Sequence, residues 1–357
     1  MKVFITRQIP DRGINLLKGK GYEVTLSPHD RVLTKDELID FLKKGRYDAV
    51  LCLLTDKIDE EVLDAAKASG VKIFANYAVG FDNVDVKAAA ERGIMVANTP
   101  GVLTDTVAEH TFSLMLAIAH RIPESDRFSR AGKFKGWEPE LLLGGDVSGK
   151  VLGIIGLGRI GLRVAHHAVK GFDMKVMYYD VKRNEEFERQ FSQPVILSSS
   201  EGSRPLGKAQ GRDSSAAPQN DIRSTVGYRP NVDDVFKEAD FISLHVPLLP
   251  QTHHLINAER LRLMKPTAYL INTSRGPIVD EAALRDALRT GTIKGAAIDV
   301  WEHEPELTPG LSELENIIIT PHTASATEET RQRMGELAAQ NIIVALEGGE
   351  PPNLIRV

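Results

Sequence analysis

The chain has 357 residues, of which 42% are hydrophobic and 26% charged, and its formal net charge is −5. This is the composition of a globular protein, and the length corresponds to about two domains. The mild acidity argues against a general nucleic-acid binder, which would carry a basic excess. The single cysteine, Cys52, excludes an intrachain disulfide and a four-cysteine zinc site, and we expect it to be a buried strand residue.

The N-terminal stretch MKVFITRQIP lacks the apolar core of a signal peptide. The most membrane-like stretch, FSLMLAIA at 112–119, is far shorter than the roughly 20 apolar residues that a spanning helix needs. The sequence therefore predicts a cytoplasmic protein that has neither a membrane nor a nucleic acid as its partner.

The N-terminal part of the chain alternates between expected strands and amphipathic helices. Strands are expected at 2–6, 47–54, 71–78 and 94–98, and helices at 35–45 and 60–70. The two helices end at Gly45 and Gly70, and glycine can adopt the left-handed conformation of a helix cap. This alternation predicts a parallel sheet that is covered by helices on both faces.

A long helix is expected at 101–121, where apolar positions recur at helical spacing. The segment after it, 127–150, is Gly-rich and irregular, and we expect an arm that packs on the second domain or on a partner subunit. A second series of strands is expected at 150–156, 174–180, 239–247, 267–274, 294–300 and 316–321. Its continuous apolar runs are typical of strands that are buried on both faces.

One stretch, 192–225, is dense in Ser, Gly, Pro and Gln and interrupts this second series. A structureless insert of this length inside a compact domain is usually a surface excursion. We therefore expect a flexible loop at 192–225, with a short strand at 194–197 as the alternative.

A glycine-rich loop, GLGRIG at 156–161, lies between an expected strand and an expected helix. It matches the G-x-G-x-x-G pattern of dinucleotide-binding folds, and Asp180 follows its third glycine by 19 residues. Gly156 permits a tight turn, Gly158 lets the backbone approach a pyrophosphate, and Gly161 permits close packing of the helix on the strand. The amides at the helix N-terminus then favour an anion.

The acidic residue that completes this pattern bears on the choice of cofactor. Asp180 is placed to accept hydrogen bonds from the ribose hydroxyls of NAD, and it would repel the 2′-phosphate of NADP. Lys182 and Arg183 follow at once, and such cations could receive a phosphate. The pattern predicts NAD as the cofactor, with NADP as the alternative.

Three late strands end in residues with useful chemistry. The strand at 267–274 runs into Arg275, the one at 294–300 into an acidic run, and the one at 316–321 into His322. Because ligands bind outside the carboxyl ends of parallel strands, we expect these residues to share one edge. An arginine fork binds a carboxylate, and a histidine oriented by a carboxylate can donate a proton near neutral pH. The set suits the reduction of a 2-oxo acid by a nicotinamide.

Each of these residues also has a structural interpretation. An arginine after a strand often anchors a loop, and a lone histidine is often a satisfied structural residue. The acids Glu302, Glu304 and Glu306 alternate as on a solvated surface, and their spacing does not decide which of them partners His322. The position at strand ends, beside a dinucleotide fingerprint, favours the active-site interpretation.

Long stretches of the chain resemble the D-isomer-specific 2-hydroxyacid dehydrogenases, above all their glyoxylate/hydroxypyruvate reductase branch. The resemblance rests on YAVGFDNVD (77–85), NTPGVLTDTVAE (98–109), GKFKGW (132–137), GLGRIG, SLHVPL (243–248), LMKPTAYLINTSRGPIVDE (263–281), GAAIDVWEHEP (295–305) and PHTASAT (321–327).

The resemblance implies an α/β protein with two Rossmann-like, doubly wound parallel-sheet domains. A flavodoxin-like substrate domain would comprise 1–99 and 323–357, and the NAD-binding domain would comprise 100–322. The implied activity is NAD(P)H-dependent reduction of glyoxylate or hydroxypyruvate, with a small 2-oxo or 2-hydroxy acid as ligand. The family is usually homodimeric, with the 101–121 helix and the arm after it in the interface.

The resemblance also implies roles for individual residues. Arg275 would bind the substrate carboxylate, and His322, paired with Glu304, would be the general acid and base. The backbone amides of Val79 and Gly80 would hold the substrate. Further implied contacts are Leu54 in the substrate pocket and, for the cofactor, Thr106, Gly156, Gly158, Arg159, Ile160, Gly161, Asp180, Pro247, Thr273 and Asp299.

Three positions distinguish this chain within the family pattern. Thr323 and Ala324 follow His322 where Ile-Gly is common, so that a methyl group faces the expected nicotinamide site. Val79 stands where phosphite dehydrogenase carries a lysine, which argues against that substrate. Asp180 differs from the Ser or Arg that is typical of hyperthermophile reductases using NADPH.

Two other functions stay open at this stage. One is another D-2-hydroxyacid dehydrogenase, such as a phosphoglycerate dehydrogenase. The other is an NADH-sensing binding protein of the corepressor type, for which the insert at 192–225 would be the partner-binding element. A metal site is not expected, because neighbours on a helix, such as His166 and His167 or His253 and His254, point in different directions.

Overall fold

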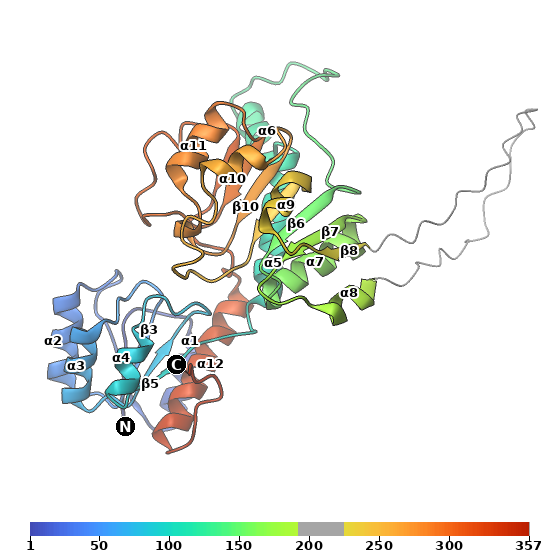
Figure 1. Cartoon of the computed structure of the whole chain (residues 1–357). Coiled ribbons are helices and arrows are strands. Elements are labelled where there is room, and N and C mark those ends of the chain that lie inside the picture. Colours follow the sequence, from blue (N-terminus) through green and yellow to red (C-terminus); the bar gives the residue numbers. More distant parts are fainter. Residues whose placement is uncertain (192–224, 357) are drawn as a thin grey trace, which may run out of the picture.

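The computed structural model describes residues 1–191 and 225–356. It contains two parallel β-sheets, one from the N-terminal part of the chain and one from the later part (Figure 1). The predicted insert, Thr225 apart, and the alternative strand at 194–197 lie outside the described residues. Among the helices of the described ranges, none is both long and apolar enough to cross a membrane.

Within the described residues, the first sheet has five parallel strands in the order β2-β1-β3-β4-β5. They are β1 (Lys2–Ile5), β2 (Glu23–Leu26), β3 (Ala49–Cys52), β4 (Ile73–Asn76) and β5 (Met95–Ala97). β3 and β4 are buried along their whole length, as their largely apolar sequences predict. The order 2-1-3-4-5 is the flavodoxin-like one.

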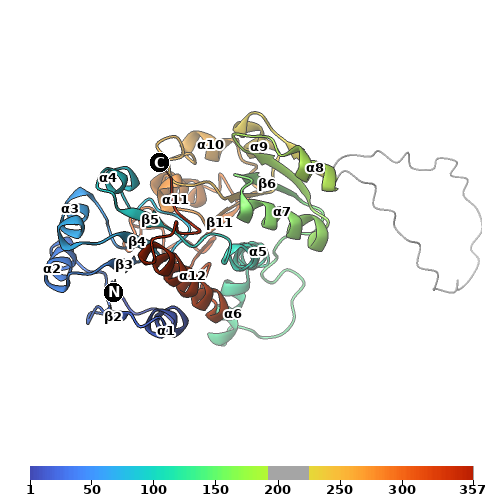
Figure 2. The ribbon, with the colours of Figure 1, turned by 90° about the horizontal axis from the view of Figure 1, so that it is seen from below.

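Helices cover both faces of this sheet. One core contains side chains of α2, α3 and α4, and the other contains those of α1 and of the last helix, α12. Figure 1 and Figure 2 show that α12, the last helix of the chain, lies beside the N-terminal elements. The bounds are α1 (Asp11–Gly19), α2 (Lys35–Gly45), α3 (Glu60–Ser69), α4 (Val86–Glu91) and α12 (Glu328–Leu346).

The two helices predicted in this part are confirmed, but only one of them has the expected glycine cap. Gly70 follows α3 with φ of 95°, in the left-handed region. α2 ends at Gly45, yet the left-handed residue is the next one, Arg46, with φ of 48°. Gly45 is needed for another reason, since a Cβ there would overlap the ring of Tyr47.

In the described ranges, the second sheet has seven parallel strands in the order β12-β11-β10-β9-β6-β7-β8. They are β6 (Val151–Ile155), β7 (Lys175–Tyr179), β8 (Val226–Tyr228), β9 (Phe241–Leu244), β10 (Tyr269–Asn272), β11 (Gly295–Ile298) and β12 (Ile317–Ile319). The order reverses beside β6, and such a switch point is where doubly wound sheets bind ligands.

Helices cover both faces of this sheet as well. One core includes α5, α7 and α8, and the other includes α9, α10 and α11. The bounds are α5 (Thr104–Ala119), α6 (Ile122–Arg130), α7 (Arg159–Phe172), α8 (Glu185–Phe191), α9 (Val232–Glu238), α10 (Ala258–Leu263) and α11 (Glu281–Arg289). The expected fold class, two doubly wound parallel-sheet α/β domains, is confirmed.

Three expectations about elements need correction. β2 and β8 were not expected, because both are short edge strands without a continuous apolar run. The helix expected at 101–121 ends at Ala119, and α6 begins after Arg121, whose φ of 54° breaks the helical path. The segment expected to be irregular from 127 on is therefore helical up to Arg130.

Candidate active site

A cavity of about 430 Å³ lies between the carboxyl ends of the two sheets. Of the predicted site residues, the cavity is lined by Leu54, Val79, Gly80, Gly158, Arg159, Ile160, Pro247, Thr273, Arg275, Asp299 and His322. Gly156, Gly161 and Glu304 lie behind this lining, next to residues that form it. Asp180 lies farther back and contacts Leu157, which precedes the lining residue Gly158. Thr106 does not line the cavity, and its hydroxyl is hydrogen-bonded to that of Thr330 in α12 at 2.7 Å.

The glycine loop after β6 has the shape that its sequence predicts. Gly156 has φ of 94°, and a Cβ there would lie 2.7 Å from the carbonyl oxygen of His245. A Cβ on Gly161 would overlap the carbonyl oxygen of Gly156, so this glycine allows α7 to begin against the loop. A Cβ on Gly158 would meet no atom within 4 Å, so the backbone is open toward the cavity. The loop and the start of α7 thus fit a dinucleotide pyrophosphate.

Asp180 follows β7 directly and contacts the glycine loop. Its carboxylate accepts a hydrogen bond from the amide of Leu157 at 2.6 Å, which ties the end of β7 to the glycine loop. Arg183, one of the two cations considered above, is bonded through its fork to Glu188, with a shortest distance of 2.7 Å. The carboxylate is therefore held where the ribose of a dinucleotide is expected, and Arg183 is directed to Glu188.

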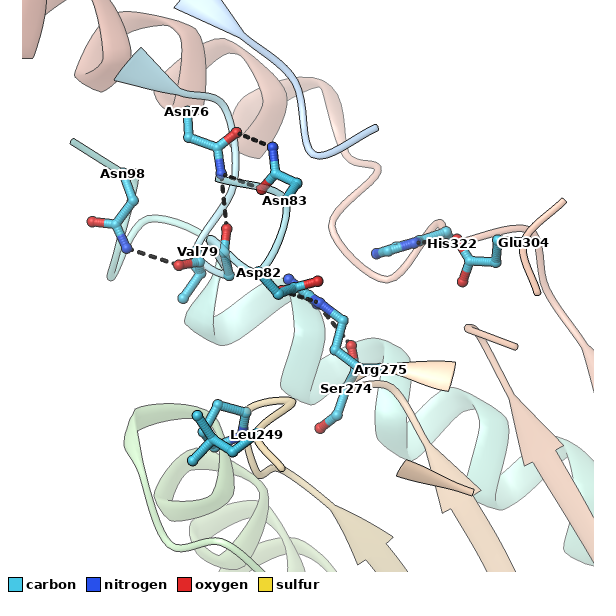
Figure 3. A network of polar contacts seen from close by, with 12 residues as sticks. Asn76, Val79, Asp82, Asn83, Asn98, Leu249, Ser274, Arg275, Glu304 and His322 are labelled. Carbon is cyan, nitrogen blue, oxygen red and sulfur yellow. Dashed lines mark hydrogen bonds and ion pairs between the residues drawn. The ribbon is translucent and has the colours of Figure 1, made fainter. Parts of the chain in front are cut away.

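A loop after β4 offers unpaired backbone amides to the cavity. The carbonyl of Val79 accepts a hydrogen bond from Asn98 at 2.7 Å, and that of Gly80 accepts one from Asn76 at 2.9 Å. Asn76 is also bonded to Asn83 at 3.0 Å, so the loop is held from behind (Figure 3). Within the described residues, the amides of Val79 and Gly80 have no hydrogen-bond partner. Two such amides suit a carboxylate.

Arg275 reaches across the cleft to this loop. Its Nε donates a hydrogen bond to Asp82 at 2.9 Å, and its Nη1 donates one to the carbonyl of Ser274 at 2.8 Å (Figure 3). A Cβ on Gly80 would overlap the guanidinium, so only glycine permits this approach. The fork keeps further N–H groups for an anion in the cavity, and Asp82 fixes its orientation.

His322 and Glu304 form a pair at the opposite wall. His322 Nδ1 lies 3.0 Å from Glu304 Oε2, and the other carboxylate oxygen accepts a hydrogen bond from the amide of Trp301 at 3.1 Å. His322 has φ of 53° and its amide is bonded to the carbonyl of Asp299, so its backbone is fixed as well. With Nδ1 engaged, Nε2 is the ring nitrogen available to a ligand in the cavity. Glu304 is thus the member of the acidic run that contacts His322.

Asp299 is fully buried between β11 and the His322 segment. Burial alone would raise its pKa, but hydrogen bonds from His110, Thr320 and the amides of Thr323 and Ala324 outweigh this and hold the pKa below its ordinary value. The two amides would be present with other residues at 323 and 324, whereas the hydroxyl of Thr323 adds a hydrogen bond to Asp299 at 3.3 Å. The Ala324 methyl group is buried and lines the cavity.

Several residues at the site were not identified from the sequence. Three of them lie in or beside the stretch YAVGFDNVD, namely Asp82, Asn76 and Asn83. Only Val79 and Gly80 of this stretch were predicted to bind substrate. Asn98 begins another quoted stretch, NTPGVLTDTVAE. Asp82 contacts Arg275, which is far away in the sequence. The asparagines contact residues of the same or a nearby loop, and no motif indicated these contacts.

The reason given against a metal site is wrong for one histidine pair. His253 and His254 lie in a turn rather than a helix, with ring centroids 4.1 Å apart. His254 Nε2 lies 2.6 Å from Glu302 Oε1. His166 and His167 are in α7, and their ring centroids are 6.0 Å apart with an interplanar angle of 76°. This agrees with the expectation that neighbouring residues on a helix point in different directions.

Comparison with known proteins agrees with this geometry. The family model described as "D-isomer specific 2-hydroxyacid dehydrogenase, NAD binding domain" matches residues 112–200 and 209–324. A glyoxylate reductase of Korarchaeum cryptofilum is 44% identical, over 99% of this chain and 95% of the relative. A glyoxylate reductase of Thermococcus litoralis is 43% identical, over 99% and 96%.

Solved structures agree as well. The NADPH-dependent glyoxylate/hydroxypyruvate reductase of Sinorhizobium meliloti, in complex with NADP and malonate, is similar with a TM-score of 0.77 and 28% identity. That match covers 99% of this chain and 96% of the other. The identity to the curated relatives extends over nearly the whole chain. The chain therefore belongs to the D-isomer-specific 2-hydroxyacid dehydrogenase family.

Proposed function

We propose that the chain reduces glyoxylate or hydroxypyruvate, with NAD(P)H, to glycolate or D-glycerate. The observation that carries the proposal is one cavity that joins two unpaired amides, an arginine fork and a histidine–carboxylate pair to an open glycine loop. The names of the relatives support the same reaction.

The glycine loop and its surroundings would hold the dinucleotide. Gly156, Gly158 and Gly161 would receive the pyrophosphate at the start of α7, and Asp180 would bind the adenosine ribose. When bound, the reduced nicotinamide supplies the hydride. The remaining proposed contacts are Thr106, Arg159, Ile160, Pro247, Thr273 and Asp299.

The chain's own residues would handle the 2-oxo acid. The amides of Val79 and Gly80 and the fork of Arg275 would hold its carboxylate, with Leu54 beside it. Arg275 would also polarise the carbonyl, and His322 Nε2 would donate a proton to the carbonyl oxygen. Glu304 would orient the ring and stabilise the imidazolium in the reverse direction. The charge that develops on the oxygen is thereby opposed by groups already in place.

A panel of substrates distinguishes this function from its alternatives. Oxidation of NADH and NADPH would be followed with glyoxylate, hydroxypyruvate, pyruvate and phosphohydroxypyruvate. We expect the highest kcat/KM for glyoxylate or hydroxypyruvate. A clear preference for phosphohydroxypyruvate would instead indicate a phosphoglycerate dehydrogenase. Tight NADH binding without turnover of any acid would indicate a cofactor-sensing binding protein.

Substitution of Asp180 by alanine is expected to erode the preference for NADH over NADPH. The substitution removes both the acceptor for the ribose hydroxyls and the charge that repels a 2′-phosphate. The measurement is the ratio of kcat/KM for the two cofactors, with one 2-oxo acid held saturating. Asp40→Ala, at an exposed carboxylate on α2, serves as the control. An unchanged ratio in Asp180→Ala would refute the role given to Asp180.

The oligomeric state is a second part of the proposal. We propose a homodimer whose interface includes α6 and the segment after it. The exposed large apolar side chains of this region are Ile122, Phe134, Trp137 and Leu143, and Trp137 is 83% exposed. Large apolar side chains exposed in one segment of the chain favour an interface there. Light scattering after size exclusion would give the mass of a dimer, whereas the mass of a monomer would contradict the proposal.

Two further predictions are retained as proposals. The domain boundaries at 1–99 with 323–357, and 100–322, are supported by the packing of α12 on the first sheet. A cytoplasmic location is supported by Cys52, which is buried and unpaired, as is common in a reducing compartment.

A further inference from the structure

Three potential metal ligands meet outside the cavity. His253 and His254 lie in the turn between β9 and α10, and Glu302 lies in the segment after β11. One ligand atom from each lies within 4.8 Å of the other two. The Glu302 side chain is only 14% exposed, whereas His253 is exposed to solvent. An ion could thus approach from the His253 side and find the carboxylate already in place.

Neighbouring groups fix two of the three ligands. The amide of Glu281, at the start of α11, donates to Glu302 Oε2 at 3.3 Å, and the amide of Glu302 donates to Glu281 Oε1 at 2.6 Å. His254 has φ of 49°, and its amide donates to the carbonyl of Pro277 at 2.8 Å. Hydrogen bonds of this kind orient metal ligands.

Carboxyl groups at the cluster favour a cation. Glu302 Oε1 lies 2.6 Å from His254 Nε2. The buried side chain of Glu281 brings a second carboxyl group close to the cluster.

The ligand set indicates the type of ion. Two imidazoles and one carboxylate are the ligands of catalytic-type zinc sites, which keep a fourth position for water. Imidazole also favours copper and nickel over magnesium and calcium. Zinc-to-ligand distances of about 2.0–2.2 Å in a tetrahedron place ligand atoms about 3.3 Å apart. The ligand atoms of the cluster already lie within 4.8 Å of one another, and His253 is exposed. We propose that His253, His254 and Glu302 bind a divalent transition-metal ion such as Zn²⁺.

A bound ion would connect two loops that also serve the cavity. The turn with His253 and His254 follows the cavity residues Pro247 and Leu249, and Glu302 precedes Glu304 by two residues. Because the ion binds the folded state, occupancy should raise the melting temperature. The proposal does not depend on the reductase activity, because it is tested by Zn²⁺ affinity and by melting temperature.

The test uses the full-length, untagged protein, freed of metal by a chelator. Zn²⁺ would be titrated against a chromophoric chelator, and melting would be followed with and without Zn²⁺. We expect one Zn²⁺ per chain and a raised melting temperature. His253→Gln and Glu302→Gln should each weaken Zn²⁺ binding about 100-fold. Loss of an outer-shell partner already weakens binding roughly 10- to 100-fold, and these residues are proposed as direct ligands. His303→Gln, an exposed histidine beside Glu302, and His166→Gln, from the helical pair, should bind as the native protein does.

His253→Gln is the decisive variant. In the described part of the chain the His253 side chain makes no hydrogen bond, so its substitution should leave the fold intact even if Glu302→Gln unfolds. Zn²⁺ binding that is equal in the native protein and His253→Gln would overturn the proposal, and so would the absence of Zn²⁺ binding by the native protein. A melting temperature that Zn²⁺ raises equally in both proteins would overturn it as well.

Discussion

Replacing His322 by alanine is expected to lower kcat for glyoxylate reduction by about 10²–10⁴-fold, which is the usual contribution of a positioned general acid. His322 Nδ1 lies 3.0 Å from Glu304, and we propose that the second ring nitrogen donates the proton in the cavity. NADH binding, measured by fluorescence titration, should change little, because the substitution leaves the glycine loop untouched.

Two companion variants make this result specific. His303→Ala removes an exposed histidine one residue from Glu304 and should keep the native kcat. Glu304→Gln retains a hydrogen-bonding side chain but loses the charge. In the double variant, its effect on kcat should not add to that of His322→Ala, because the proposed roles of the two residues depend on each other. If His322→Ala kept more than a tenth of the native kcat, His322 would not be the general acid.

Replacing Arg275 by lysine is the second substitution with a large expected effect. Lysine keeps the charge but lacks the planar fork, so it cannot hold Asp82 and a substrate carboxylate together. Loss of one charge-assisted hydrogen bond, worth about 1.5–3 kcal/mol, lowers kcat/KM roughly 10- to 100-fold. The effect should be greatest on KM for the 2-oxo acid, with the affinity for NADH unchanged.

Asp82→Asn tests the orientation of Arg275 by Asp82 separately from substrate binding by Arg275. The asparagine oxygen can still accept from Arg275 Nε, but the ion pair is lost, so the fall in kcat/KM should be smaller than in Arg275→Lys. Arg260→Lys changes an arginine that is paired with Asp233 and does not line the cavity, and it controls for the substitution itself. Native kcat/KM in Arg275→Lys would contradict the role of the fork.

The fold could be predicted from the sequence where one pattern dominates. Unbroken apolar runs gave the central strands of both sheets, because strands buried on both faces have few polar positions. The edge strands β2 and β8 carry no such run. The break at Arg121 was also missed, because the apolar spacing of α5 continues to the end of the helix and gives no sign of a left-handed residue after it.

The site could be predicted in part. Parallel strands bring their carboxyl ends together, which is why Arg275 and His322 were expected at one edge and both line the cavity. Spacing could not choose among the three acids, and only the resemblance pointed to Glu304, which is the one that contacts His322. Asp82 contacts Arg275 from the other part of the chain, a contact that depends on tertiary packing. The asparagines hold the Val79 loop through the folded shape of that loop, which no motif indicated.

The most direct test of the account is the rate of NADH oxidation by the purified native chain with glyoxylate, beside His322→Ala under the same conditions. The account predicts steady turnover by the native chain that is lost in the variant, while both proteins bind NADH. Binding of NADH without turnover of glyoxylate, hydroxypyruvate or any other 2-oxo acid would contradict it.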